Sequence, residues 1–172
     1  ELPPPRYFRP GPLLPADGAV AAPTSQRGPL RLREVTAADH LRERMVWATP
    51  SQEYGFYEQA RWTEPPAAFV EAALGRALFE RGPFVRAAGA DAPILDVHVA
   101  AFEEVTGGAT HEARVALRVL LTGADGQALL EQTFVGAAPV PEEDAGAAAA
   151  AIGRAMDQAV TAAAHAVVSS LQ

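Results

Sequence analysis

The sequence predicts an α/β fold: a single compact domain with a mixed, mostly antiparallel sheet packed by an amphipathic helix and a long C-terminal helix. Three observations support this class. Apolar and polar residues alternate over 94–102 and 113–121, the period of strands. Apolar residues recur every three or four positions over 69–78 and 152–171, the period of helices. The chain has 172 residues, 49% of them hydrophobic, which is enough for one core.

Residues 1–28 are predicted to form a proline-rich tether, partly disordered, ahead of a globular domain over 29–172. Seven prolines lie in this stretch, and proline fixes φ and lacks an amide donor, so neither a helix nor a central strand is expected. Tyr7 and Phe8 are its only bulky aromatics and are expected to dock on the fold as a short edge strand. An extended linker of about 25 residues would reach roughly 75 Å.

The first half of the domain is predicted to hold three strands and a helix. Leu and Arg alternate over 29–35, which indicates a half-buried strand, and the polar stretch 36–43 indicates a loop or one helical turn. Two strands joined by a turn are expected at 45–48 and 54–62, the second rich in the aromatics that strands favour.

Thr63 is predicted to cap the amphipathic helix, since Pro65 and Pro66 suit a first turn whose amides have no intrahelical partner. Gly82-Pro83 is expected to end this helix, and a short strand follows at Phe84-Val85.

The second half is predicted to be an antiparallel meander and a helix. The two alternating strands continue through a turn at 122–127 into a third strand at 129–135. Pro139-Val140-Pro141 is expected to break that strand. Acidic residues 142–144 then stand where negative charge favours a helix N-terminus.

The overall charge argues against a nucleic-acid partner. All 14 basic residues are Arg, against 21 acidic residues, and the net charge is −7. A protein that binds phosphate backbones needs clustered cations, and the sequence has no basic stripe. No apolar run reaches the ~20 residues that span a bilayer, and the absence of cysteine excludes disulfides, thiolate metal sites and thiol nucleophiles.

The sequence offers no recognisable catalytic, cofactor-binding or metal site, so the chain is expected not to be an enzyme and to need no cofactor. No serine lies in a nucleophile elbow, and a phosphate-binding loop would need the Lys that the chain lacks. None of the histidines has zinc-ligand spacing. They are His40, His98, His111 and His165.

Two groups of carboxylates have simple structural explanations. Glu103-Glu104 is expected at the solvated end of a strand, and residues 142–144 at the start of a helix. Neither group is therefore assigned to acid–base catalysis.

An aromatic segment is the candidate partner interface. Aromatic residues together with Arg are enriched in protein interfaces, although the same residues can also fill a core. We favour the core for Trp62, and Tyr54 and Tyr57 are the better interface candidates. The full set is Tyr54, Phe56, Tyr57, Arg61 and Trp62.

The order of several short motifs resembles the ABC-type transport auxiliary lipoprotein family, which includes the PqiC-like intermembrane transport lipoproteins. The motifs are Tyr7-Phe8, Leu30-Arg31-Leu32, His40-Leu41 before Met45-Val46, and Arg61-Trp62-Thr63-Glu64-Pro65 before a helix. The Arg-Trp-x-Glu-Pro block is the most specific of these, and the resemblance covers nearly the whole chain.

The resemblance implies a non-catalytic periplasmic lipoprotein that is tethered to the outer membrane. It would bind the mammalian-cell-entry (MCE) component of a transporter that moves lipids or other hydrophobic molecules. Two features depart from the family pattern: the acylated N-terminal Cys is missing, and Asp39 stands where a Pro often precedes the pair at His40-Leu41. A start at Glu1 without Met suggests a trimmed mature chain.

Two alternatives stay open at this point. One is a periplasmic binding module for a small apolar ligand or for a cell-envelope partner, such as a protein of peptidoglycan synthesis. The other is an enzyme with an unrecognised site. An aromatic-lined cavity would favour the first, and convergent His or carboxylate groups in a cleft the second. Homo-oligomerisation is also left open.

Overall fold

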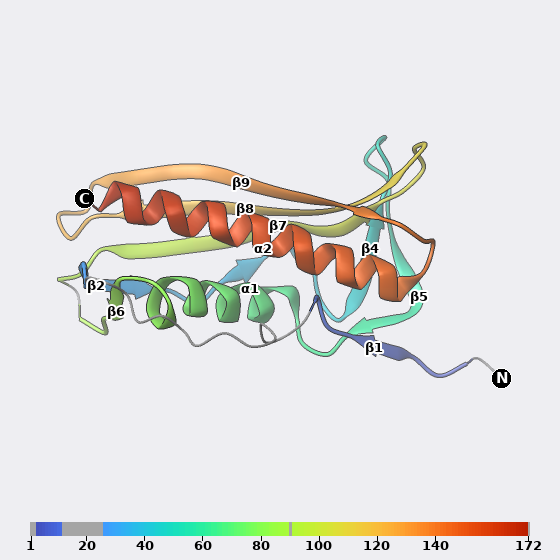
Figure 1. Cartoon of the computed structure of the whole chain (residues 1–172), viewed down its shortest axis with the longest axis horizontal. Coiled ribbons are helices and arrows are strands. Elements are labelled where there is room, and N and C mark those ends of the chain that lie inside the picture. The colour runs from blue at the N-terminus through green and yellow to red at the C-terminus, as the bar shows by residue number, and fades with distance from the viewer. Residues whose placement is uncertain (1–2, 12–25, 90, 172) are drawn as a thin grey trace.

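A long sheet with two helices on one of its faces makes up the domain (Figure 1). This computed structural model describes residues 3–11, 26–89 and 91–171. The α/β class predicted from the sequence, with a mixed sheet and a long C-terminal helix, is confirmed.

Three long antiparallel strands form one side of the sheet. On the middle strand every odd-numbered residue from 113 to 121 is buried and faces the helices, as the alternating sequence predicts. The strands are longer than expected from the sequence. They are β7 (Ile94–Val105), β8 (His111–Thr122) and β9 (Ala128–Val140).

Shorter strands extend the sheet beyond β7. The predicted hairpin is present as β4 (Arg44–Ala48) and β5 (Tyr54–Trp62), and β4 pairs in parallel with β7. The predicted edge strand is confirmed as β1 (Arg6–Phe8), which pairs in parallel with β5. Three small strands complete the fold in parallel pairings: β2 (Gly28–Leu32), β3 (Thr36–Ala37) and β6 (Phe84–Arg86).

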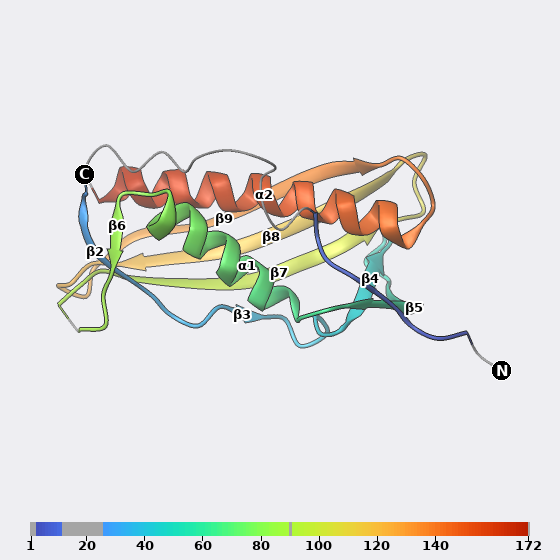
Figure 2. The same ribbon diagram turned by 60° about the horizontal axis from the view of Figure 1, so that its bottom comes forward.

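Both helices pack on the same face of the sheet and lie side by side (Figure 2). Helix α1 (Pro66–Gly75) continues into a π-helical segment, η1 (Arg76–Glu80). The predicted cap at Thr63 is wrong: the cap position is Pro65 and no side chain caps this end, because the two prolines need no amide acceptor there. Helix α2 (Ala145–Ser170) begins at Asp144, whose carboxylate accepts hydrogen bonds from the amides of Gly146 and Ala147.

The core between the helices and the sheet contains an aromatic cluster. Trp62 meets Phe69 and Phe102 edge-to-face, with ring centroids 6.1 and 5.4 Å apart. Elsewhere small residues allow α2 to lie close to the sheet, and its buried face is largely alanine. The predicted close packing of this helix is therefore present.

The predicted break at Pro139 is wrong, since β9 continues to Val140. β9 is an edge strand, where a residue without an amide donor costs no ladder hydrogen bond. Helix α2 covers this end of the edge: Arg154 donates to the Pro139 carbonyl at 3.1 Å, and the Gln158 side chain accepts from the Ala137 amide at 3.1 Å.

The N-terminal segment is fixed to the fold at several points. The Thr63 amide donates to the Phe8 carbonyl (3.0 Å), and Pro10 is buried. Gly11 lies directly on α2 at Gly153, where an added Cβ would come within 2.7 Å of the Gly11 Cα. Of the predicted tether, residues 12–25 lie outside the described residues, so its disorder stays a prediction.

Candidate functional site

The face of the sheet opposite the helices is the candidate functional surface. Both helices of the described chain lie on one face, which leaves the other face of β7, β8 and β9 uncovered by a helix (Figure 2). The even-numbered residues of β8 point to this open face, because the odd-numbered ones are buried under the helices.

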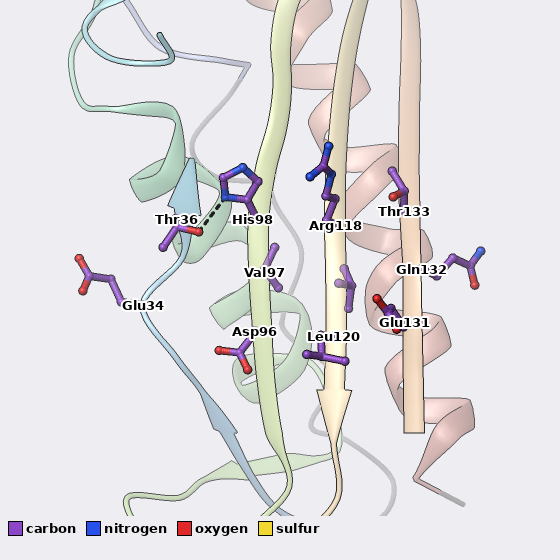
Figure 3. Close-up of a pocket in the computed structure, with 11 residues that line it drawn as sticks. Glu34, Thr36, Asp96, Val97, His98, Arg118, Leu120, Glu131, Gln132 and Thr133 are labelled. Atoms are coloured by element: carbon purple, nitrogen blue, oxygen red, sulfur yellow. Dashed lines mark hydrogen bonds between the residues drawn. The ribbon is translucent and has the colours of Figure 1, made fainter. Parts of the chain in front are cut away.

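A shallow groove of about 540 Å³ crosses the open face. We call it the sheet groove (Figure 3). Its polar groups are partly paired: the Thr36 hydroxyl hydrogen-bonds to His98 Nδ1 at 2.9 Å, and Arg33 donates to Asp96 at 3.3 Å. The residues that line it come from four separate parts of the chain: Glu34, Thr36, Asp96, Val97, His98, Arg118, Val119, Leu120, Glu131, Gln132 and Thr133.

Two exposed aromatic residues on β5 point to the same side of the sheet as the groove. Val46 pairs with both Phe56 and Glu103, and Glu103 pairs with Arg114, so these side chains share the face of the groove. Tyr54 precedes Phe56 by two residues on β5 and therefore points to the same side of the sheet. Tyr54 is 46% exposed and Phe56 39% exposed.

Each of the two aromatic rings packs against a polar side chain. His40 lies edge-on to Tyr54, with the ring centroids 5.2 Å apart. The Arg44 guanidinium lies 4.8 Å from the centroid of Phe56. Rings fixed in this way lose little conformational freedom when a partner binds.

The other three candidate interface residues are less exposed. Tyr57 is half-buried and packs on the core, and Arg61 donates from Nη1 to the carbonyls of Tyr57 (3.2 Å) and Ala60 (3.1 Å). Trp62 is only 2% exposed, in the aromatic cluster of the core. The structure thus brings Tyr54 and Phe56 together on the open face and places Trp62 inside.

A second cavity, of about 520 Å³, lies beside β5. Tyr57 and Trp47 contribute aromatic surface to it, and several ionisable side chains contribute polar surface. Its lining is Trp47, Phe56, Tyr57, Glu58, Glu104, Thr106, His111 and Glu143. We call it the acidic cavity.

The expected solvation of Glu103-Glu104 is wrong, because β7 continues to Val105 and both side chains are buried. Glu103 is fully buried, and its Oε1 accepts hydrogen bonds from Nη2 and Nε (3.2 Å) of Arg114 on β8. Its Oε2 has no hydrogen-bond partner among the described residues. An Arg directly opposite on the neighbouring strand is the signal that could have revealed this pair.

Glu104 belongs to a chain of three ionisable groups. His111 Nδ1 lies 2.7 Å from Glu104 Oε1, and His111 Nε2 lies 3.5 Å from Glu143 Oε1. Burial raises the pKa of Glu104 above its ordinary value of 4.5, and the hydrogen bond from His111 opposes part of that rise. This chain ties the ends of β7 and β8 to the residues before α2.

The described residues show neither a metal site nor a membrane span. Across 3–11, 26–89 and 91–171 no three His, Asp or Glu side chains are arranged to hold a metal ion. No helix in this part of the chain combines the length and hydropathy that crossing a bilayer requires. What the site offers is a face with fixed aromatic rings and a polar groove, which suits recognition of another molecule.

A family model described as "ABC-type transport auxiliary lipoprotein component" matches residues 13–164. No curated protein matches the sequence.

Solved structures resemble the fold over almost its full length. Protein XCC0632 from Xanthomonas campestris is 23% identical with a TM-score of 0.76, covering 97% of this chain and 94% of that one. An uncharacterized protein is 16% identical with a TM-score of 0.71, covering 96% and 99%. The hypothetical protein CT253 from Chlamydia trachomatis is 7% identical with a TM-score of 0.59, covering 84% and 97%. These similarities show that the fold is shared.

Proposed function

The chain belongs to the ABC-type transport auxiliary lipoprotein family, and from this membership we propose that it is the periplasmic lipoprotein subunit of an MCE-type transporter. In this role it is tethered to the outer membrane by an N-terminal lipid. It binds the MCE protein without catalysing a reaction, and it serves the movement of lipids between membranes.

The observation that carries the proposal is the open face of the sheet. Tyr54 and Phe56 project from it, and the sheet groove lies on the same side of the sheet, over β7, β8 and β9. Aromatic residues in such positions commonly supply most of the binding energy of a protein interface. The partner would contact the two rings first and extend along the groove.

The polarity of the groove favours a protein partner over a small apolar ligand. Pockets for such ligands are mostly apolar with few polar groups. The sheet groove instead carries three carboxylates, one guanidinium and an imidazole, from Glu34, Asp96, Glu131, Arg118 and His98. The acidic cavity also contains three carboxylates. Neither cavity matches the environment that a lipid tail requires.

The direct test measures binding of the purified chain to the MCE protein encoded beside it. We expect binding at micromolar concentration or tighter, and a dissociation constant about tenfold weaker for Tyr54→Ala and for Phe56→Ala, the effect of a typical interface anchor. Val85→Ala is the matched control, because Val85 is an equally exposed apolar residue on β6. Its affinity should equal that of the unmodified chain.

Two results would count against the proposal. The absence of binding at micromolar concentration would remove the MCE protein as the partner. Binding that neither aromatic substitution weakens would move the interface away from the open face.

A further inference from the structure

Two arginines face each other across the β4–β5 hairpin and line one cleft. Arg44 and Arg61 are directly opposite in the antiparallel pairing, so their side chains leave the sheet on the same side. Both line a cavity of about 430 Å³, together with Pro3, Pro5, Glu58 and Gln59. We call this cavity the arginine cleft.

No carboxylate of the described residues forms an ion pair with either guanidinium in the cleft. Among the described residues, no acidic oxygen lies within 4.0 Å of Arg44 or Arg61, and Glu58, which also lines the cleft, makes no ion pair with them. Of the other strand arginines in the described part of the chain, Arg6 and Arg114 are paired with carboxylates, whereas Arg31, Arg86 and Arg118 are not. Arg44 and Arg61 differ from these three in that they lie directly opposite each other on neighbouring strands.

The contacts that the two arginines do make fix their position without cancelling their charge. Arg44 lies over the Phe56 ring, and Arg61 donates from Nη1 to two main-chain carbonyls of the described chain. Like charges directly opposite each other on neighbouring strands destabilise a sheet. An anion between them would remove that repulsion, and the planar guanidinium matches the oxygens of a phosphate.

We propose that the arginine cleft binds a phosphate group, either that of a lipid headgroup or free phosphate in solution. Pro3 and Pro5 form part of its wall and precede β1, so the cleft lies where the N-terminal segment enters the fold. Under the proposed function this end is nearest the membrane, which would bring lipid phosphates within reach. The phosphate chemistry of the cleft does not depend on that function.

The test has two arms, both with the purified chain alone. In the first, inorganic phosphate is titrated and binding is followed by calorimetry and by the NMR signals of the arginine Nε–H groups. In the second, the chain is co-sedimented with vesicles of equal parts phosphatidylglycerol and phosphatidylcholine, and with phosphatidylcholine vesicles for comparison. Because the MCE protein is absent, the outcome is independent of the partner-binding test.

We expect Arg44→Gln and Arg61→Gln each to weaken binding by about fivefold or more, since each removes a charge-assisted contact. Arg81→Gln is the control: it removes the same charge from an exposed residue at the end of η1. Its binding should be unchanged. If Arg61→Gln fails to fold, Arg44→Gln still gives the result, because the Arg44 side chain lies on an exposed ring.

The arms identify the source of the phosphate. Arginine-dependent binding of inorganic phosphate assigns the cleft to a soluble anion, and arginine-dependent binding of the mixed vesicles alone assigns it to a lipid headgroup. The absence of binding in both arms would overturn the proposal. An equal loss with Arg81→Gln would also overturn it, because the attraction would then depend only on total charge.

Discussion

Gly136 on β9 and Ala155 on α2 lie so close together that no side chain fits between them. A Cβ on residue 136 would overlap the carbonyl oxygen of Ala155, and it would lie 2.8 Å from the Ala155 carbonyl carbon and 3.0 Å from the Ala159 amide nitrogen. All three atoms belong to the helix backbone, which cannot move aside by a change of rotamer. This contact sets the distance between α2 and the sheet.

Gly136→Ala is therefore expected to destabilise the fold by roughly 1–3 kcal/mol, because α2 must shift away from β9. The free energy of unfolding from urea denaturation measures the change. Gly89→Ala is the matched control, since a Cβ there has no heavy atom within 4 Å. It should change stability by less than about 0.5 kcal/mol. Equal stabilities of the two variants would show that α2 adjusts without cost.

Arg114→Met is expected to cost roughly 2–3 kcal/mol. The substitution leaves the fully buried Glu103 carboxylate without its partner, and the value is at the lower end for such pairs because the Arg114 side chain is 39% exposed. The double variant Glu103→Leu, Arg114→Met removes both charges and should recover most of the loss. A single variant as stable as the original chain would mean that water or relaxation solvates Glu103.

Glu104→Gln is expected to change the pH dependence of stability. Burial raises the folded-state pKa of Glu104 above 4.5, so the folded state binds more protons than the unfolded state as the pH rises past that value. Ionised Glu104 therefore lowers the free energy of unfolding at pH values above its raised pKa. This destabilisation disappears below pH 4.5, where the carboxyl is protonated in both states. Gln keeps an acceptor for His111 but cannot ionise.

Thermal unfolding at pH values well above and well below 4.5 checks this sign. The melting temperature of Glu104→Gln, relative to the unmodified chain, should be higher above that pH than below it. Glu112→Gln, an exposed carboxylate of β8, is the control and should show no such trend. The opposite trend would mean that attraction to His111 outweighs the cost of burial.

The regular parts of the fold were predictable because they follow a simple period. Every odd-numbered residue from 113 to 121 is apolar, and the structure shows a strand there with each of these residues buried. The end of β7 was missed because its period is broken. The register shifts between Val99 and Ala101, so Phe102 rather than Ala101 faces the core. A pattern read from sequence alone ends at that point, and Glu103-Glu104 then looks like a solvated strand end.

The candidate site was predictable only where its residues are neighbours in sequence. Tyr54 and Phe56 stand two residues apart on one strand, so their aromatic character was visible at once. The sheet groove joins Glu34, His98, Arg118 and Thr133, which come together only through the pairing of distant strands. The arginine cleft likewise depends on the register that places Arg44 opposite Arg61.

Gly153→Ala is expected to release the N-terminal segment while leaving the helix intact. The new Cβ would meet Gly11 and Pro10, and Ala is favoured over Gly inside a helix by about 1 kcal/mol. Amide hydrogen exchange at residues 6–8 should become faster, and protease should cut the segment more readily. Gly75→Ala in α1 is the control, since the nearest atom to its Cβ belongs to the flexible Arg86 side chain. An unchanged exchange rate at residues 6–8 in Gly153→Ala would show that the contact between Gly11 and Gly153 is not needed to hold β1 on the fold.

The close contact between Gly11 and Gly153 determines which part of the chain would set the distance between the domain and the lipid anchor of the proposed function. Gly11 is fixed on α2, and the Arg27 amide is hydrogen-bonded to the Pro83 carbonyl at 2.8 Å, so residues 12–25 join two points of the same body. Under the proposed function, an insertion between these two points would not change the distance from the domain to an N-terminal lipid. The same insertion before Arg6 would add about 3 Å per residue. Under the proposed function, only the insertion before Arg6 would change the distance between the domain and the membrane.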